Sequence, residues 1–176
     1  MDASVVGDLL PRDRRREQAA LVVPAADREM SYRDFFTTAY KAGNVLRFLG
    51  TSDTSTVAIE PQPAPEPLLA FLGAAQLGAT ATFDPAADAR LVLVGVAQEA
   101  EYTPPSGAKL AVYGGPPESP TTVHWEQQVW SENPGFPETP VDPDATVLRA
   151  NGEDYSHASL LAAADEVVDA LEAVVG

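Results

Sequence analysis

The sequence predicts an α/β fold with a mainly parallel sheet flanked by helices. Segments with the pattern of strands alternate with segments that have the period of helices, and such an alternation builds parallel sheets. Residues 90–94 and 109–113 are apolar after their first residue, and residues 79–83 have the pattern of a further strand. Continuous apolar runs are typical of strands that are covered on both faces.

The N-terminal part is predicted to hold a β-hairpin followed by a helix. Residues 19–23 form a short apolar run that ends at Pro24, and residues 29–32 resume the strand pattern. Ser31 can cap the helix, because its hydroxyl can accept from a free amide of the first turn and Asp34 lies three residues on. We expect this helix to end at Gly50, with one apolar face that consists of Tyr32, Phe35, Phe36, Ala39, Gly43, Leu46 and Leu49.

A second strand and a second helix are predicted next. Residues 56–60 have the pattern of a strand, and residues 61–65 hold three prolines, which exclude a helix or a central strand. Pro67 then opens a helix over residues 68–77. This helix is apolar nearly all round and contains Gly73, a combination that indicates burial and close packing of backbones.

The last part of the chain is predicted to hold a long connection, a strand and a helix. Prolines recur over residues 114–143, around a short helix at about residues 124–131, so we expect an extended surface connection. Residues 144–148 can form a strand, and Ser156 can cap the final helix. One face of that helix carries Leu160, Leu161, Ala164, Val167, Val168, Leu171 and Val175, while Asp165, Glu166, Asp169 and Glu172 are expected to face water.

The charge balance is unusual for a chain of ordinary composition. The 176 residues include 26 acidic and 11 basic ones, for a net charge of −15. A negative field of this size repels nucleic-acid phosphates and anionic membranes, so we expect neither as a partner. Acidic residues spread along the chain favour a halophilic cytoplasm, as in acidic proteins of the haloarchaeal type, over one acidic partner-binding face.

Several other classes of protein and site are excluded by the same composition. The sequence has no cysteine, which excludes disulfides, thiolate metal sites and a cysteine nucleophile. No run approaches the ~20 apolar residues of a membrane span, and the first residues lack the pattern of a secretory signal. We therefore expect a cytoplasmic protein.

Specific strings of the chain resemble the N-terminal subdomain of the adenylate-forming superfamily, which includes acyl-CoA synthetases. Residues 20–23 and 30–34 are similar to the family's A-L-V and L-T-Y-x-E-L motifs. Residues 70–85 are similar to its segment A-x-L-G-A-x-x-A-G-A-V-x-V-P-L-D-P. Shorter matches lie at residues 42–46, 89–94 and 125–126. The resemblance is strongest over residues 14–113 and implies one truncated domain of this type over residues 1–176, with the connection at 114–143 and the final strands and helix at 144–176.

The resemblance breaks where the family holds the nucleotide phosphates. Residues 141–148 and 155–160 look like the strand before the phosphate-binding loop and the L-T-H-x-N-L motif after it. Between them the family has T-S-G-T-T-G-x-P-K-G, whereas residues 149–154 offer one glycine, one arginine and two carboxylates. Glu153 and Asp154 would repel a phosphate. We expect residues 151 and 152, Asn-Gly, to form a tight hairpin turn that joins two shortened strands.

The resemblance also implies that other catalytic parts are missing. In the family the adenine-binding segment, a Thr-Glu motif and a C-terminal domain with a catalytic lysine follow later in the chain, and this sequence ends at Gly176. It is therefore expected to correspond to about the first third of such an enzyme. Whether residues 149–154 leave an open cleft or a filled one stays open at this point.

The remaining polar candidates have simple structural interpretations. His157 and His124 lack metal-ligand spacing, and His157 is expected to cap or pack. Asp142 and Asp144 are interpreted as solvated charges. The basic cluster of Arg12, Arg14, Arg15 and Arg16 is expected to pair with carboxylates of the same chain, and residues 114–117, Gly-Gly-Pro-Pro, are expected to form a turn. Trp125 and Trp130 are expected to anchor the connection on the core. Ser31, Ser156 and Ser159 lie outside any G-x-S-x-G setting, so none is assigned as a nucleophile.

The sequence supports three hypotheses for function. The first is a non-catalytic remnant of an acyl-CoA synthetase-like protein that acts as a binding or assembly module, as a homo-oligomer or with another protein. The second is the N-terminal piece of a split adenylate-forming ligase that needs a separate chain. The third is a sensor of a small ligand at the carboxyl ends of the strands. We assign no catalytic, cofactor-binding or metal-ligating residue and expect no cofactor.

Overall fold

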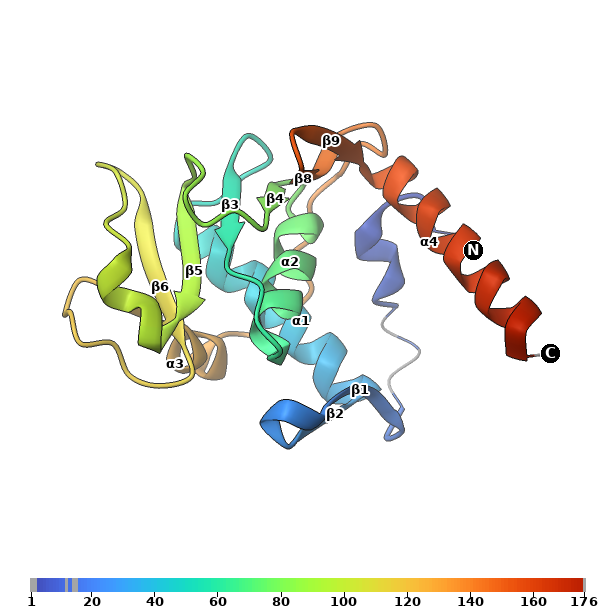
Figure 1. Ribbon diagram of the computed structural model, residues 1–176, viewed down its shortest axis with the longest axis horizontal. Coiled ribbons are helices and arrows are strands. Elements are labelled where there is room, and N and C mark those ends of the chain that lie inside the picture. Colours follow the sequence, from blue (N-terminus) through green and yellow to red (C-terminus); the bar gives the residue numbers. More distant parts are fainter. Residues whose placement is uncertain (1–2, 12, 14–15, 176) are drawn as a thin grey trace.

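The chain folds into a seven-stranded, mostly parallel sheet with its two longest core helices on one face (Figure 1). The computed structural model describes residues 3–11, 13 and 16–175, and the side chains of these up to residue 174. The strand order is β7-β6-β5-β3-β4-β8-β9. The helices are α1 (Tyr32–Phe48), α2 (Pro65–Gln76), α3 (Trp125–Ser131) and α4 (His157–Val175), with short 3-10 turns η1 (Val6–Leu9), η3 (Pro24–Ala26) and η4 (Val96–Glu101).

The sheet confirms the predicted α/β class. All neighbouring pairs from β7 to β8 run parallel, and only the last pair, β8 with β9, is antiparallel. A separate two-stranded antiparallel ribbon lies beside α1, as predicted. The strands are β1 (Ala19–Val23), β2 (Arg28–Ser31), β3 (Thr56–Ile59), β4 (Thr80–Thr82), β5 (Leu91–Gly95), β6 (Lys109–Tyr113), β7 (Val123–His124), β8 (Thr146–Ala150) and β9 (Glu153–Ser156).

The two main helices begin with the caps and prolines that the sequence contains. The Ser31 hydroxyl accepts from the Asp34 amide at 3.1 Å, which confirms the predicted cap of α1. The prediction that α2 begins at Pro67 is wrong, because the helix begins at Pro65. Both prolines lie in the first helical turn, where the amide N–H that proline lacks has no partner to bind anyway.

The helices α1 and α2 cross with their backbones in close contact. A Cβ atom built on Gly73 of α2 lies only 2.8 Å from the backbone nitrogen of Gly43 in α1 and 2.9 Å from the carbonyl carbon of Ala42. The apolar, glycine-containing helix predicted at residues 68–77 is therefore buried as expected. Its close approach to α1 leaves no space for a side chain at Gly73.

The core lies on both faces of the sheet. Between the sheet and helices α1, α2 and α3 the buried side chains include Leu46, Ile59, Leu91 and Trp125. The opposite face buries a smaller cluster around Val92. A third cluster joins η1, α1, α2, β8 and the start of α4; its members include Leu10, Phe36, Tyr40, Leu69, Val147 and Leu161.

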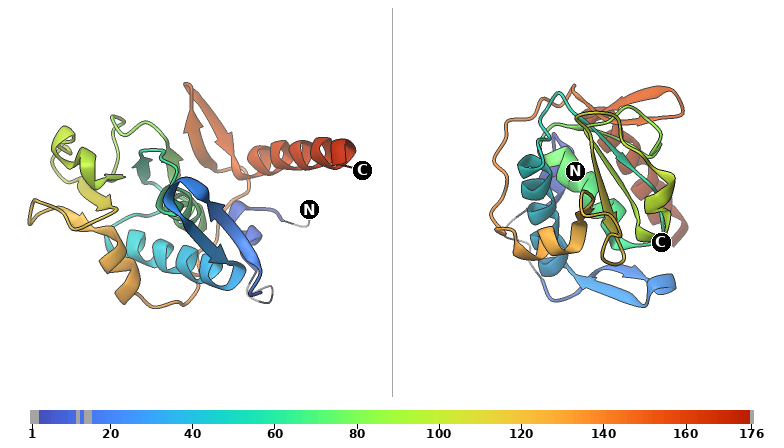
Figure 2. Two further views of the ribbon diagram at one scale, coloured as in Figure 1. Left: turned by 60° about the horizontal axis from the view of Figure 1, so that its bottom comes forward. Right: turned by 90° about the vertical axis from the view of Figure 1, so that its left-hand side faces the viewer.

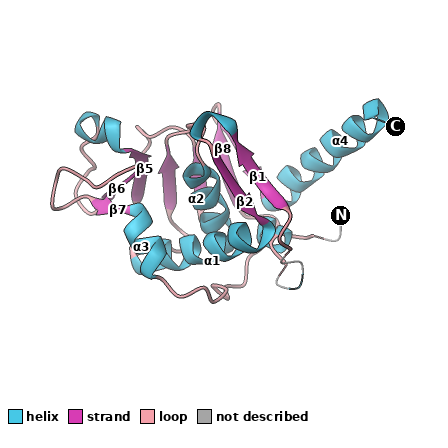
Figure 3. Ribbon diagram, turned by 90° about the horizontal axis from the view of Figure 1, so that it is seen from below, coloured by secondary structure: helices cyan, strands magenta, loops and turns pink. Residues whose placement is uncertain are grey.

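The connection between β6 and β8 is more structured than its prolines suggest. Residues 123 and 124 add an unpredicted edge strand, β7, to the sheet (Figure 3), and α3, the orange helix in Figure 2, follows directly. Trp125, the first residue of α3, is buried in the core, as predicted. The same expectation for Trp130 is wrong, because 85% of its surface is exposed. In a helix, Trp125 and Val129 share a face, whereas Trp130 points elsewhere.

The last helix projects from the body of the molecule. Figures 1 and 3 both show α4 extending away from the sheet, with contacts to the rest of the chain near its first turns. Only His157 and Leu161 are buried among its described side chains. No helix in the described part of the chain is long and apolar enough to cross a membrane.

Candidate functional site at the carboxyl ends of the strands

A two-residue turn stands where the resemblance places a phosphate-binding loop. Strands β8 and β9 pair antiparallel, with Arg149 opposite Asp154 and Ala150 opposite Glu153. The two residues between the strands, Asn151 and Gly152, have φ values of 55° and 79°. Two consecutive residues with positive φ are the signature of a type I′ turn, which favours Asn-Gly. The predicted tight hairpin is confirmed.

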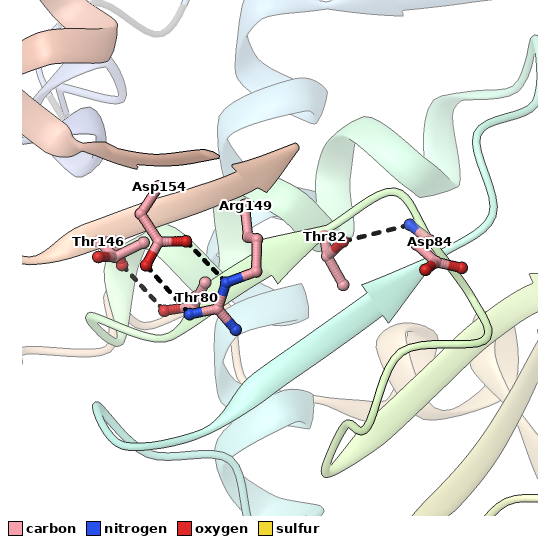
Figure 4. Close-up of polar contacts among 6 residues, drawn as sticks. All are labelled: Thr80, Thr82, Asp84, Thr146, Arg149 and Asp154. Carbon is pink, nitrogen blue, oxygen red and sulfur yellow. Dashed lines mark hydrogen bonds and ion pairs between the residues drawn. The ribbon is translucent and has the colours of Figure 1, made fainter. Parts of the chain in front are cut away.

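The short turn leaves a cleft beside it. This cleft has a volume of about 490 Å³ and is lined by Thr82, Phe83, Asp84, Ala87 and residues 149–152. These residues follow or end the parallel strands β4 and β8, and the carboxyl ends of parallel strands are where ligands bind in open α/β sheets. The side chains of Thr82, Asp84 and Arg149 are shown in Figure 4. Whether residues 149–154 leave an open cleft or a filled one is thus answered: the cleft beside them is open.

The single cation among the described residues that line this cleft is already engaged. The Arg149 guanidinium donates to both carboxylate oxygens of Asp154, Nε to Oδ1 at 2.7 Å and Nη2 to Oδ2 at 3.2 Å (Figure 4). This hydrogen bond from Arg149 lowers the pKa of Asp154, so the carboxylate stays charged. Because Asp84 adds a further carboxyl group, the cleft presents negative charge to an entering ligand.

The frame of the cleft is fixed by one hydrogen bond between neighbouring strands and one within the turn after β4. The Thr80 hydroxyl of β4 donates to the Thr146 carbonyl of β8 at 3.1 Å. At the other end of β4, the Asp84 amide donates to the Thr82 hydroxyl at 3.3 Å. These contacts tie β4 to β8 and shape the turn after β4, so the cleft is part of the sheet rather than of a long loop (Figure 4).

His157 packs in the interior instead of reaching the cleft. Its side chain is fully buried, and its Nδ1 atom accepts a hydrogen bond from the Val6 amide at 3.1 Å. The neighbouring Ser156 accepts from the Ser159 amide at 3.1 Å and so caps α4, as predicted. His157 is absent from the described lining of the cleft. The predicted packing role is confirmed, and a general-base role has no geometric support.

His157 makes the stability of the protein dependent on pH. Burial lowers its pKa, an effect that the charge of Asp8 partly offsets. The folded state therefore prefers the neutral imidazole, and stability should fall as the pH drops below the ordinary histidine pKa of about 6.5. We expect His157→Asn, whose amide oxygen can still accept from Val6, to flatten this part of the pH profile of urea unfolding. An unchanged profile in that variant, or the same flattening in His124→Asn, would contradict the assignment.

Sequence reasoning missed a second polar cluster at the ends of β3 and β6 and the first turns of α2 and α3. The Tyr113 side chain is 4% exposed, and its hydroxyl has no hydrogen-bond partner among the described residues. Burial, together with the charges of Glu60, Glu66 and Glu126, raises the pKa of Tyr113 to about 12. Tyr113 is the last residue of an apolar strand. The strand pattern therefore predicts that its ring packs in the core, but it does not indicate the environment of its hydroxyl.

Removing this hydroxyl is expected to cost no stability. A buried donor without a partner carries a desolvation penalty of about 1–3 kcal/mol, which Tyr113→Phe removes while the ring is kept. We expect the free energy of unfolding in urea to stay the same or rise by about 1 kcal/mol. A loss of more than about 1 kcal/mol would mean that the hydroxyl makes a stabilising contact in solution.

The other sequence candidates do not converge on the cleft. His124 lies 3.6 Å from the Glu126 carboxylate, and the described residues contain no group of three or more metal-ligating side chains. Asp142 and Asp144 are exposed, in line with solvated charges. The predicted turn at residues 114–117 is present, with φ values of 87° and 157° at its two glycines. Arg12, Arg14 and Arg15 of the basic cluster lie outside the described residues, so their predicted pairing remains untested.

The fold itself matches solved structures of acyl-CoA ligases. The anthranilate CoA ligase AuaEII, solved with anthranoyl-AMP, superposes with a TM-score of 0.73 at 19% identity over 87% of this chain. ATP-bound MatB from Rhodopseudomonas palustris gives 0.74 at 17% identity over 94%. The N-terminal domain of FACL13 from Mycobacterium tuberculosis gives 0.67 at 21% identity over 87%. The fold is that of the N-terminal part of acyl-CoA ligases.

The likeness to acyl-CoA ligases is one of fold and covers part of each ligase. The match spans 35% of AuaEII, 37% of MatB and 44% of the FACL13 domain, so this chain corresponds to less than half of each. No protein-family model and no curated protein matches the sequence. The acyl-CoA ligase fold confirms the resemblance predicted from residues 14–113, although the strings that carry it are short.

Proposed function

We propose that this chain is a non-catalytic binding or assembly module with the acyl-CoA ligase fold. The observation that carries the proposal is the tight turn at Asn151 and Gly152, which stands where the sequence resemblance leads us to expect a phosphate-binding loop. Backbone amides of a glycine-rich loop cradle phosphate oxygens, and a lysine neutralises charge that develops during attack on the α-phosphate. A two-residue turn offers neither the amides nor the cation.

The electrostatics of the cleft support the same proposal. Arg149 is the single cation among the described residues that line the cleft, and Asp154 holds it in a bidentate ion pair. To reach Arg149, a triphosphate would have to displace Asp154, and its negative charge would be repelled by the nearby carboxylates of Glu153 and Asp84. Since like charges oppose binding, the site is expected to reject ATP.

Two measurements test the proposal. The first is ATP–pyrophosphate exchange by the purified chain with a panel of carboxylic acids, for which we expect no signal. The second is calorimetric titration of ATP and of AMP with magnesium in concentrated salt, for which we expect no heat of binding. Exchange above the rate of a heat-inactivated sample would overturn the proposal, as would micromolar binding that is lost in the variant Arg149→Ala.

The cleft that survives beside the turn favours a second candidate, a sensor of a small ligand. A volume of about 490 Å³ suits a small molecule, and the carboxyl group of Asp84, beside an Arg149 already paired with Asp154, favours a neutral or cationic one. A ligand present at about 100 times its Kd stabilises the folded state by about 2.7 kcal/mol, a shift of several degrees in Tm. Thermal melts with fractionated cell extract test this, and we expect Asp84→Asn to reduce any shift; if no fraction raises Tm, the sensor is excluded.

A further inference from the structure

The second half of α4 carries an apolar face that the described part of the chain does not cover. Every described side chain from residue 166 to residue 174 is exposed. The large apolar ones among them are Val167 at 59%, Val168 at 43%, Leu171 at 59% and Val174 at 84%. The sequence predicts this apolar face, and the structure shows that the rest of the described chain does not cover it. The side chain of Val175, which was predicted to share the face, lies outside the described residues.

The spacing of the apolar residues is that of a helix that packs against another helix. Residues 157, 160, 164, 167, 171 and 174 are separated alternately by three and four positions, which is the a/d pattern of a coiled-coil seam. The first of these residues is the buried but polar His157, and the apolar ones are Leu160, Ala164, Val167, Leu171 and Val174. The first residue of this seam, His157, packs on the body together with the flanking Leu161, and the rest of the seam projects beyond it (Figures 1 and 3). The described part of the chain leaves this projecting part of the seam uncovered.

The positions of the charges on α4 favour a second copy as that partner. Its four carboxylates, Asp165, Glu166, Asp169 and Glu172, fall at the outer b, c and f positions of the seam. The flanking e and g positions, where charges select the partner of a helix pair, hold Leu161, Ala163, Val168 and Ala170. Two copies would therefore meet without like charges across the seam. A partner with basic flanks would find no carboxylate at these positions to pair with.

We propose that two copies of this chain associate through the exposed face of α4 in a two-fold symmetric helix pair. A self-complementary face of this kind closes into a dimer. The proposal deepens the assembly role proposed above and names its partner. Because each copy carries a net charge of −15, long-range repulsion opposes the dimer at low salt. Salt shortens the Debye length from ~10 Å at 0.1 M to ~3 Å at 1 M, so the association should strengthen as salt is added.

Sedimentation equilibrium of the full chain tests this in about 0.1 M and about 1 M KCl, where the screening differs most. We expect a mass near twice 18.6 kDa in concentrated salt. Leu171→Glu, which places a carboxylate in the seam, is expected to weaken the dimer at least about tenfold. Ala173→Glu is the matched control, because it adds the same charge to the same helix at an exposed outer position and should leave the dimer intact.

Three outcomes would overturn the inference: a monomer under all conditions, a dimer that survives Leu171→Glu, or an association that weakens as salt is added. Circular dichroism of both variants shows whether the fold is kept, which the exposure of residues 171 and 173 leads us to expect. Failure of the dimer leaves the result of the ATP–pyrophosphate exchange unaffected. The inference and the proposed function can therefore fail separately.

Discussion

Trp125→Ala is expected to lower the free energy of unfolding by about 3–5 kcal/mol, the largest effect of a single substitution considered for this chain. The Trp125 side chain is 2% exposed and belongs to the main apolar cluster between the sheet and the helices, together with Leu46, Ile59 and Leu91. Its removal leaves a cavity that the surrounding strands cannot close. Urea unfolding, followed by circular dichroism so that the loss of a tryptophan does not alter the signal, measures the change.

The chain supplies a matched control five residues away. Trp130 lies in the same short helix, but 85% of its surface is exposed. Its backbone carbonyl accepts from the Lys41 amine at 3.1 Å, a contact that survives truncation of the side chain. We expect Trp130→Ala to change stability by no more than about 0.5 kcal/mol. Equal losses in the two variants would show that α3 does not pack as described.

Gly73→Ala is expected to destabilise the protein by about 2 kcal/mol, although alanine is the better helix former. Overpacking costs about 1–3 kcal/mol, and the upper end applies because the added Cβ would meet the α1 backbone at Gly43 and Ala42, which cannot move aside like a side chain. The gain in helix propensity offsets about 1 kcal/mol of this cost. The midpoint of urea unfolding should fall without a change in its slope.

Gly7→Ala serves as the control for this second substitution. A Cβ atom at Gly7 lies 3.5 Å from the Gln76 Cγ atom, which is an ordinary contact with a side chain. We expect its stability to stay within about 0.5 kcal/mol of the parent chain. If Gly73→Ala proved as stable as Gly7→Ala, the close crossing of α1 and α2 would be wrong.

Much of the fold can be predicted because its strands and caps leave local signals. The runs that contain β5 and β6 are continuous and apolar, and Ser31 and Asn151 have the side chains that a cap and a tight turn require. Strand β7 could not be predicted, because two residues show no period. The sequence predicts the start of α2 at Pro67, two residues too late, because a proline-rich segment excludes the interior of a helix but not its first turn.

In the candidate site, too, the features with a local sequence signal could be predicted and those that depend on distant segments could not. The turn at residues 151–152 is a local feature and was predicted, whereas the cleft depends on the parallel register that sets Thr82 of β4 beside Arg149 of β8. The environment of Tyr113 depends on carboxylates from three other segments, and no pattern near residue 113 indicates them. An amphipathic period similarly identified the apolar face of α4 but could not say what covers it.

The two ends of the sheet limit how copies of this chain can add to one another. One edge strand, β7, has only two residues, and the other, β9, carries the exposed carboxylates of Glu153 and Asp154. Short or charged edges resist pairing with a strand of a neighbouring molecule, which is the route to open-ended filaments and aggregates. Growth by strand addition is therefore disfavoured at both edges of the sheet. If copies of this chain associate as proposed for α4, we expect them to stop at a closed pair, because the sheet offers no edge for a third molecule to extend.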